Sequence, residues 1–354
     1  MSPPRIVVFA PADEESLSLL EEAGCHLTLG TAGWTSPQGN SEDELVTMAA
    51  DADVLAGATI KSSRISRRVM ESSDRLRLVA KYSVGVDDVD IDAANELGIL
   101  VTNAPTEANW GAVAEHTMAT MLALLKKLRE RDLSVRDGVW RAPELTATYV
   151  GRREGDGYGG ITIGLVGLGR VGGRVAHLLR PWGARVIAAD PYVGSQRFAD
   201  HGVKQVDLDT LLRQADVISV HVTLTAQTRH LIGRQQLSIM KPTAILQNNA
   251  RGPVVDETAL AEALQQGGIA GAALDVFEHE PLPADSPLRE LGDKVLLSPH
   301  MSASCQQAGL HQGCRWAAEG MLEAMQGRLP DHIVNPDVIE SWLARFEGRS
   351  AFDA

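Results

Sequence analysis

Short apolar runs alternate with amphipathic stretches from residue 5 to residue 101. The runs cover residues 5–10, 52–56, 76–80 and 99–101, and an acidic helix start at residues 13–15 follows the first of them. This alternation predicts a parallel sheet with helices packed on it. Residues 81–87 would form the loop at the end of the third strand. Open parallel sheets bind ligands at the carboxyl ends of their strands, so we expect this loop to border a site.

A helical pattern follows this first series of strands. It runs from Trp110 to about Glu130, with apolar residues at Val113, Met118, Met121, Leu122, Leu125 and Leu128. The spacing predicts one long amphipathic helix. We interpret its methionines and Trp110 as core or subunit-interface residues, and we expect a glycine-rich, charged loop over residues 149–160.

The alternation of strands and helices then repeats. Strands are predicted at residues 161–166, 184–189, 215–221, 244–249, 270–274 and 294–298, about six in all, with a helix at 257–266. A further helical pattern extends from Cys305 to Gly327. Because 354 residues exceed what one hydrophobic core usually serves, the sequence predicts two α/β domains.

The first strand of the second series leads into a glycine-rich turn. Gly167, Gly169 and Gly172 have the G-x-G-x-x-G spacing, and a helical apolar pattern begins directly behind them. A strand, a tight turn and a helix start form the context that a dinucleotide site needs. The first glycine permits the turn, the second lets the backbone approach a pyrophosphate, and the third lets the helix pack on the strand.

The next predicted strand ends in Asp190. Its offset from the glycines is near the ~20 residues at which an acidic residue accepts the hydroxyls of the adenosine ribose. The carboxylate would repel a 2′-phosphate, and no arginine follows it directly. We therefore predict NAD as the cofactor instead of NADP. The structural alternative is an α/β turn without a ligand.

Charge and cysteine content restrict the class of protein. A formal net charge of −13 argues against nucleic acid and anionic membranes as partners, because both favour clustered lysine and arginine. The three cysteines, Cys25, Cys305 and Cys314, form no C-x-x-C pair and suit a reducing compartment. The N-terminal apolar run is too short for a signal peptide, and no run approaches the ~18 residues of a membrane span. We expect a soluble cytoplasmic protein without a metal site.

Three polar residues follow the ends of predicted strands, where open-sheet ligands bind. They are Arg251, Glu280 and His300. Each alone also fits a structural role, as a surface ion pair, a turn residue or a satisfied histidine. Together they suit the reduction of a ketone by hydride transfer. An imidazolium protonates the developing alkoxide, a carboxylate orients the imidazole, and a guanidinium binds the substrate carboxylate and polarises the carbonyl.

Several further segments occur in an order that resembles the D-isomer-specific 2-hydroxyacid dehydrogenase family over nearly the whole chain. The matching segments are residues 84–87, 113–115, 167–172, 248–252 with 255–256, 274–281 and 298–300. The resemblance implies an α/β fold of two doubly wound parallel-sheet domains. A Rossmann-type NAD-binding domain, residues 110–299, would be inserted into a split flavodoxin-like substrate domain, residues 1–109 and 300–354. A homodimer built largely on the helix after residue 110 is also implied.

The resemblance implies roles for individual residues. His300 would be the general acid/base, Glu280 its partner, and Arg251 the group that binds the substrate carboxylate and carbonyl. The remaining substrate-site residues would be Ser83, Val84 and Gly85, the last two through their backbone N–H groups. The cofactor site would contain Gly167, Gly169, Arg170, Val171, Gly172, Asp190, Val222, Thr223, Thr228, Asn249, Ala250, Arg251, Asp275 and His300.

The chain departs from the family pattern at several positions. Ser83 stands where the family often has glycine, Ser302-Ala303 replaces a Gly-Gly pair, and Thr223 replaces a frequent proline. The segment 106–111 is about one residue longer than usual and contains Trp110, which could shape a pocket or pack between lobes or subunits. Ser83, Ser302 and this segment lie at or near the expected substrate cleft, so the substrate stays open. The other histidines considered are interpreted as structural, namely His116, His177, His201, His221 and His311.

The sequence therefore predicts an NAD-dependent oxidoreductase that interconverts a 2-keto acid and a (D)-2-hydroxy acid. Formate dehydrogenase relatives resemble a Gln–His pair, which Glu280 argues against. Phosphite dehydrogenase relatives keep an Arg–Glu–His set and stay open. A phosphoglycerate dehydrogenase relative also stays open as an alternative, although we expect no regulatory domain after residue 340 and the sequence has no concentration of basic residues for a phosphorylated substrate. Corepressors that resemble this family keep the fold, NAD binding and the catalytic residues, so an NAD(H)-binding regulatory protein is the alternative from another class.

Overall fold

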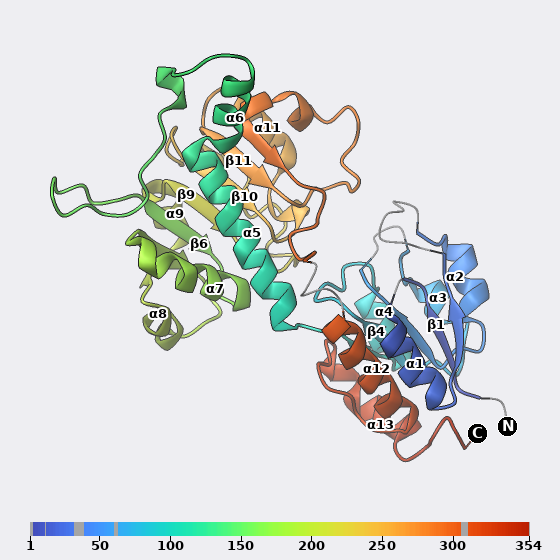
Figure 1. The fold of residues 1–354 in the computed structure, drawn as a ribbon. Helices are drawn as coiled ribbons and strands as arrows, with labels where there is room; N and C mark the ends of the chain where they lie inside the picture. Colours follow the sequence, from blue (N-terminus) through green and yellow to red (C-terminus); the bar gives the residue numbers. More distant parts are fainter. Residues whose placement is uncertain (1–2, 11, 32–38, 60–62, 306–310, 354) are drawn as a thin grey trace. The chain divides into compact units, whose positions relative to one another are not determined.

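The computed structural model describes residues 3–10, 12–31, 39–59, 63–305 and 311–353 (Figure 1). The chain forms two compact units: unit 1 is Met1–Asn109 with Gln306–Ala354, and unit 2 is Trp110–Cys305. The sequence places the second boundary after residue 299, whereas in the structure it follows Cys305. Hydrogen bonds explain the difference. The backbone N–H groups of residues 300–302 donate to the carbonyl and carboxylate oxygens of Asp275, which keeps this segment with unit 2.

Unit 1 contains a five-stranded parallel sheet with the strand order β2-β1-β3-β4-β5. Its strands are β1 (Arg5–Val8), β2 (His26–Leu29), β3 (Val54–Gly57), β4 (Leu78–Lys81) and β5 (Leu100–Thr102). This is the flavodoxin-like order, which confirms the predicted fold of this unit. The sequence pattern does not predict β2, because this edge strand is exposed or half-buried along its length and has no buried apolar run.

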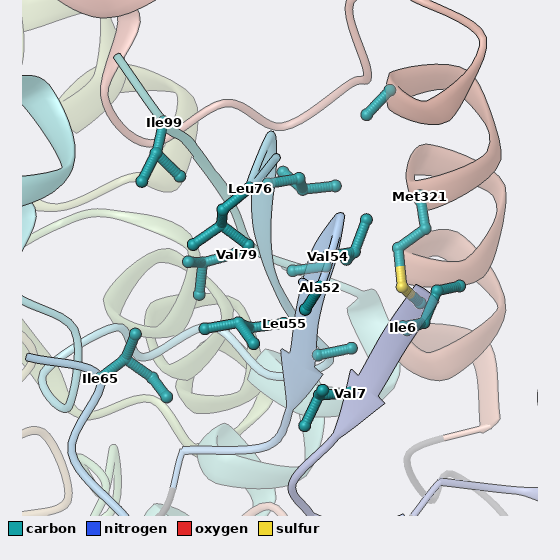
Figure 2. Close-up of a cluster of buried hydrophobic side chains, with 14 of the residues drawn as sticks. Ile6, Val7, Ala52, Val54, Leu55, Ile65, Leu76, Val79, Ile99 and Met321 are labelled. Carbon is teal, nitrogen blue, oxygen red and sulfur yellow. The ribbon is translucent and has the colours of Figure 1, made fainter. Parts of the chain in front are cut away.

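Both ends of the chain contribute to the core of unit 1. Its helices are α1 (Glu14–Glu22), α2 (Glu42–Ala49), α3 (Arg67–Met70), α4 (Ile91–Leu97), α12 (His311–Met325), α13 (Ile339–Phe346) and the 3₁₀ helix η6 (Pro336–Val338). Helices α1 and α12 lie side by side. Met321 of α12 lies near Ile6 of β1 within one cluster of buried apolar side chains (Figure 2). Burial of this shared apolar surface joins the two chain segments into one unit.

Unit 2 contains a seven-stranded parallel sheet with the strand order β12-β11-β10-β9-β6-β7-β8. Its strands are β6 (Thr162–Val166), β7 (Arg185–Ala189), β8 (Lys204–Gln205), β9 (Val217–Val220), β10 (Ile245–Asn248), β11 (Gly271–Leu274) and β12 (Val295–Leu297). Counted within the unit, the order is the Rossmann order 3-2-1-4-5-6 with a seventh strand added, which confirms the predicted fold. The sequence predicts about six strands and misses β8, a short and exposed edge strand.

The helices of unit 2 include one that differs from its prediction. They are α5 (Glu107–Lys126), α6 (Leu128–Arg136), α7 (Arg170–Leu179), α8 (Ser195–His201), α9 (Leu208–Gln214), α10 (Arg234–Ser238) and α11 (Glu257–Gln265). Short 3₁₀ helices lie at η1 (Pro143–Leu145), η2 (Arg180–Trp182), η3 (Gly252–Val254), η4 (Pro287–Glu290) and η5 (Gly292–Lys294). The prediction of one helix to Glu130 is wrong, because Lys127 has a left-handed φ of 51° and separates α5 from α6. The carbonyl of Leu125 accepts the N–H of Thr148 at 2.9 Å, so a tertiary hydrogen bond replaces continuation of the helix.

Helix α5 packs on the sheet of unit 2 through apolar and polar contacts. Met118 and Met121 belong to a buried cluster with residues of β6 and α7, which confirms their prediction as core residues. The buried Gln247 of β10 donates to the carbonyl of Thr117 at 3.2 Å and to Oγ1 of Thr120 at 2.9 Å. In the described part of the chain, no helix is long and apolar enough to cross a membrane.

Candidate active site

The turn between β6 and α7 has three glycines in three different environments. Gly167 has a φ of 97°, and a Cβ there would lie 2.6 Å from the carbonyl oxygen of His221. A Cβ at Gly172 would lie 2.2 Å from the carbonyl oxygen of Gly167, so only glycine permits this close packing of α7. At Gly169 no atom of the described residues lies within 4 Å of the Cβ position. This combination of a forced turn, an open position and a close helix contact fits a pyrophosphate-binding turn.

The start of α7 and the end of β7 complete a surface for a dinucleotide. Helix α7 begins at Arg170, and no side chain of the described residues caps it, which leaves N–H groups of its first turn available to an anion. The carboxylate of Asp190 accepts the N–H of Leu168 at 2.8 Å and that of Tyr192 at 2.9 Å. A carboxylate has about four acceptor positions, so Asp190 can still accept ribose hydroxyls. The residues of this turn therefore fit NAD.

Arg197 on α8 also holds the glycine-rich turn, although no local sequence pattern predicts this role. Its Nε donates to the carbonyl of Leu168 at 3.1 Å, and its Nη2 donates to the carbonyl of Gly169 at 2.9 Å. Because the peptide group is planar and trans, fixing the carbonyl of Gly169 directs the N–H of Arg170 to the opposite side. A Cβ at Gly173 would lie 3.0 Å from Nη2 of Arg197, so this glycine leaves room for the guanidinium. Contacts between residues so far apart in sequence produce no periodic signal.

The other cofactor residues predicted in loops also follow strands of this sheet. Val222 and Thr223 come after β9, and Thr228 closes their loop by donating to the carbonyl of Thr223 at 2.6 Å. Asn249 and Ala250 come after β10. The Nδ2 of Asn249 donates to Oγ1 of a threonine on α5 at 2.9 Å. Since all strands are parallel, these loops lie at the carboxyl ends of the strands, on the same side of the sheet as the glycine-rich turn.

Glu280 and His300 are in direct contact. Nδ1 of His300 lies 2.8 Å from Oε2 of Glu280, and Oε1 of Glu280 accepts the N–H of Phe277 at 2.9 Å. The side chain of His300 is 40% exposed, whereas that of Glu280 is 15% exposed. Since the carboxylate engages Nδ1, the histidine can exchange a proton through Nε2. A half-exposed imidazole that is hydrogen-bonded to a carboxylate is suited to general acid/base chemistry.

Asp275 holds the backbone of the segment that carries His300. Asp275 is fully buried after β11, and its carbonyl accepts the N–H of His300 at 2.8 Å. Its carboxylate accepts the hydroxyl of Ser298 at 2.6 Å and the N–H groups of Met301 and Ser302 at 3.0 and 2.9 Å. These bonds maintain His300 at a φ of 54°, a left-handed conformation that is uncommon for residues other than glycine. Asp275, predicted as a cofactor residue, thus also anchors the histidine.

Arg251 follows β10, the strand beside β11. Nδ2 of Asn248 donates to the carbonyl of Arg251 at 2.9 Å. The adjoining Gly252 packs on the segment before Glu280, since a Cβ at Gly252 would lie 2.0 Å from the carbonyl oxygen of Phe277. The backbone beside Arg251 therefore touches the segment that carries Glu280. Arg251, Glu280 and His300 thus come after three neighbouring strands, at the carboxyl ends of these strands.

The three predicted substrate residues of unit 1, Ser83, Val84 and Gly85, lie in the loop after β4. This confirms that residues 81–87 include a loop at the carboxyl end of a strand. Ser83 and Val84 are half-buried, and Gly85 is buried. Trp110 is also half-buried, at the start of unit 2.

His221 lies behind the glycine-rich turn and makes stability depend on pH. Its Nε2 is buried and has no hydrogen-bond partner in the part of the chain that the structure describes. Burial lowers the pKa of His221 from 6.5 to about 4. The unfolded chain therefore binds a proton first as the pH falls. The contribution of this neutral histidine to stability is fully present above pH 6.5 and is lost as the pH approaches 4.

We expect protonation of His221 to lower the free energy of unfolding by at most about 3 kcal/mol over this pH range. Urea denaturation at a series of pH values measures the effect. The His221→Asn variant should have a smaller decrease between pH 6.5 and 4 than the wild type. Equal pH dependence of the two proteins would show that the imidazole is solvated in the folded state.

Comparison with known proteins agrees with this geometry. The family model described as the D-isomer specific 2-hydroxyacid dehydrogenase, NAD binding domain, matches residues 118–302. The chain is 37% identical over 345 residues to a D-3-phosphoglycerate dehydrogenase of Methanocaldococcus jannaschii, covering 97% of this chain and 62% of that protein. It is also 37% identical over 340 residues to a glyoxylate reductase of Korarchaeum cryptofilum, covering 95% of this chain and 97% of that protein.

A solved structure shares the arrangement of elements. The D-lactate dehydrogenase of Aquifex aeolicus, complexed with NAD and lactic acid, superimposes with a TM-score of 0.76 at 29% identity, covering 94% of this chain and 99% of that chain. The family model covers the glycine-rich turn, Asp190 and the Glu280–His300 pair. The chain thus belongs to the D-isomer specific 2-hydroxyacid dehydrogenase family and contains its NAD-binding domain.

Proposed function

We propose that this protein is an NAD-dependent oxidoreductase that interconverts a 2-keto acid and a (D)-2-hydroxy acid. The observation that carries the proposal is the 2.8 Å contact between His300 and Glu280. It lies in the same unit as a turn that fits a dinucleotide. A proton donor backed by a carboxylate is what the reduction of a ketone requires beside a source of hydride.

Each proposed catalytic residue has a distinct task. Bound NADH supplies the hydride that reduces C2 of the keto acid. His300 holds the proton at Nε2 and donates it to the oxyanion that develops at C2, while Glu280 stabilises the imidazolium through Nδ1. Arg251 binds the substrate carboxylate and polarises the carbonyl with its forked N–H donors. In the oxidation direction His300 accepts the hydroxyl proton.

The relatives support a small 2-keto acid as substrate. The K. cryptofilum relative is named for glyoxylate reduction, and the A. aeolicus structure contains lactic acid. The test is loss of NADH absorbance with glyoxylate, hydroxypyruvate, pyruvate, phenylpyruvate, branched keto acids and 3-phosphohydroxypyruvate. We expect a kcat/KM of ~10⁴ M⁻¹s⁻¹ or more with one of these acids. Tight NADH binding without turnover of any of them would favour the NAD(H)-binding regulatory protein.

The preference for NAD over NADP is assigned to Asp190. Its carboxylate would repel the 2′-phosphate of NADPH, so Asp190→Ala should raise NADPH affinity about tenfold and weaken NADH affinity by a similar factor. Fluorescence titrations with both cofactors measure these changes. The Asp200→Ala variant, which removes an exposed carboxylate on α8, is the control for the change in net charge. An unchanged cofactor preference in Asp190→Ala would mean that the ribose lies elsewhere.

We further propose that the protein is a homodimer. Exposed apolar side chains gather on α6 and the segment after it, namely Leu128, Leu133, Val135, Val139 and Trp140. Trp140 is 74% exposed, and a run of such residues on one segment is typical of a subunit interface. Sedimentation velocity tests the proposal, and a monomer at micromolar concentration would contradict it.

A cytoplasmic location is proposed from the thiols. All three cysteines are free, and burial raises the pKa of Cys25 to about 11 and that of Cys314 to about 12. Protonated, buried thiols are unreactive, and free cysteines suit a reducing compartment. Cell fractionation tests this location.

A further inference from the structure

The loop after β4 has three consecutive carbonyl groups that each accept a hydrogen bond. These are the carbonyls of Ser83, Val84 and Gly85. The donors are the N–H of Ala104 at 3.1 Å, Nδ2 of Asn103 at 2.8 Å and Oγ1 of Thr59 at 2.5 Å, respectively. Two of the three donors are therefore side chains, brought to the loop from the segments after β3 and β5.

Fixed carbonyl groups determine where the N–H groups of the loop point. In a planar trans peptide, the carbonyl of one residue and the N–H of the next face opposite sides. The bonds to the carbonyls of Ser83 and Val84 therefore direct the N–H groups of Val84 and Gly85 away from Ala104 and Asn103. Among the described residues, neither of these two N–H groups has an acceptor. Successive N–H groups that share one side form a concave site for an anion.

The hydroxyl groups of Thr59 and Ser83 form a directed chain of hydrogen bonds. The N–H of Thr59 donates to Oγ of Ser83 at 3.3 Å, the two hydroxyl oxygens are 2.8 Å apart, and Oγ1 of Thr59 donates to the carbonyl of Gly85. Each hydroxyl has one proton, so Ser83 must donate to Thr59. Ser83, where the family often has glycine, thus uses its hydroxyl within the loop.

A buried ion pair closes the base of this loop. Nζ of Lys81 lies 2.7 Å from Oδ2 of Asp88 and donates to the carbonyl of Ala58 at 2.8 Å. Both charged side chains are fully buried. Breaking a buried pair leaves an uncompensated charge, so the two ends of the loop are held firmly. The side chains that fix the carbonyls therefore act on a loop whose ends do not move freely.

We propose that Thr59 and Asn103 are positioning residues for the substrate carboxylate. Asn103 holds the carbonyl of Val84 and thereby directs the N–H of Gly85, and Thr59 holds the carbonyl of Gly85 and thereby fixes the next peptide group. The loop then keeps its N–H groups oriented toward the anionic end of the 2-keto acid. This inference rests on the proposed function and adds the two side chains that give the loop its binding geometry. Neither side chain needs to touch the substrate.

Two near-isosteric variants test the inference. Thr59→Val removes the donor to Gly85, and Asn103→Asp replaces the donor to Val84 by a carboxylate oxygen. Each should raise the KM for the keto acid about 10- to 100-fold, because charge-assisted hydrogen bonds to the carboxylate are weakened. The kcat should change by less than about threefold and the Kd of NADH should stay unchanged, since binding of the carboxylate is common to ground and transition states.

Matched variants separate this role from general damage. Thr59→Ser keeps the hydroxyl and should restore a KM near that of the wild type. Ser83→Ala leaves the bond from Thr59 to Gly85 in place and should raise KM less than Thr59→Val does. Thr47→Val removes a hydroxyl that donates to the carbonyl of Asp43 at 2.8 Å within α2, and should leave KM unchanged.

A binding measurement gives a readout besides turnover. Calorimetry of oxamate, a carboxylate analogue of a keto acid, with the NADH-bound protein should show the same loss of affinity in Thr59→Val and Asn103→Asp. Unchanged KM and oxamate affinity in both variants of an active enzyme would overturn the inference, as would an equal loss of NADH affinity. If the wild type reduces no keto acid, the proposed function fails, and the oxamate titration still decides whether the loop binds a carboxylate in this way.

Discussion

Replacing His300 with alanine is expected to lower the kcat for keto-acid reduction by about 10²–10⁴-fold, the usual contribution of a positioned acid. Without the imidazole, no side chain bound to Glu280 can deliver a proton to the developing oxyanion. The Kd of NADH should change by less than about threefold, because the proposed main contacts of NADH are with the glycine-rich turn and Asp190. Steady-state kinetics and NADH fluorescence titration measure the two effects separately.

Because the backbone of His300 is in the left-handed region, a second variant is needed beside His300→Ala. At a φ of 54°, alanine is less favourable than asparagine, which adopts the left-handed region more readily. His300→Asn should therefore keep the local backbone and still lose the same factor in kcat. Glu280→Gln keeps a polar group beside Nδ1 but removes the charge, and should have an intermediate kcat. Turnover retained in both His300 variants would remove this residue from the mechanism.

Replacing Gly172 with alanine is expected to weaken NADH binding about 100-fold or more and to lower the free energy of unfolding by about 1–3 kcal/mol. A Cβ at this position would lie 2.2 Å from the carbonyl oxygen of Gly167, and a backbone atom cannot move aside as a flexible side chain can. Helix α7 would have to withdraw from the turn. The N–H groups of its first turn would then no longer point toward the pyrophosphate.

Gly169→Ala is the matched control for Gly172→Ala. In the part of the chain that the structure describes, no atom lies within 4 Å of a Cβ at Gly169, so the folded protein should retain its stability. The methyl group would face the space that a pyrophosphate needs, so NADH affinity should still fall. Thermal denaturation and NADH titration of both variants separate packing from binding. Equal stability of wild type and Gly172→Ala would show that α7 does not need this close contact.

Much of the fold and several candidate site residues can be predicted from local sequence patterns. Buried parallel strands are continuous apolar runs, so every strand of both sheets except β2 and β8 is visible in the sequence. The glycine spacing and Asp190 are tied to one strand–turn–helix unit. Glu280 and His300 come after the ends of two neighbouring strands, and the parallel topology brings these ends to one side of the sheet. In the structure the two side chains lie 2.8 Å apart.

Other features depend on contacts that no local pattern contains. The edge strands β2 and β8 take their conformation from backbone pairing with a neighbour, and their exposed side chains carry no apolar signal. The left-handed Lys127 depends on the hydrogen bond that Thr148 donates to the last turn of α5.

The sequence by itself therefore determined the two parallel-sheet domains, the dinucleotide turn and the pairing of Glu280 with His300. Short-range periodicity and the positions of strand ends depend on consecutive residues, so the sequence alone contains them. Only the tertiary structure decided that Arg197 holds the glycine-rich turn and that Thr59 and Asn103 hold the loop after β4. These side chains donate to carbonyl groups of segments distant in sequence. Such hydrogen bonds form only after the sheet has brought the segments together, so their geometry cannot be read from either segment alone.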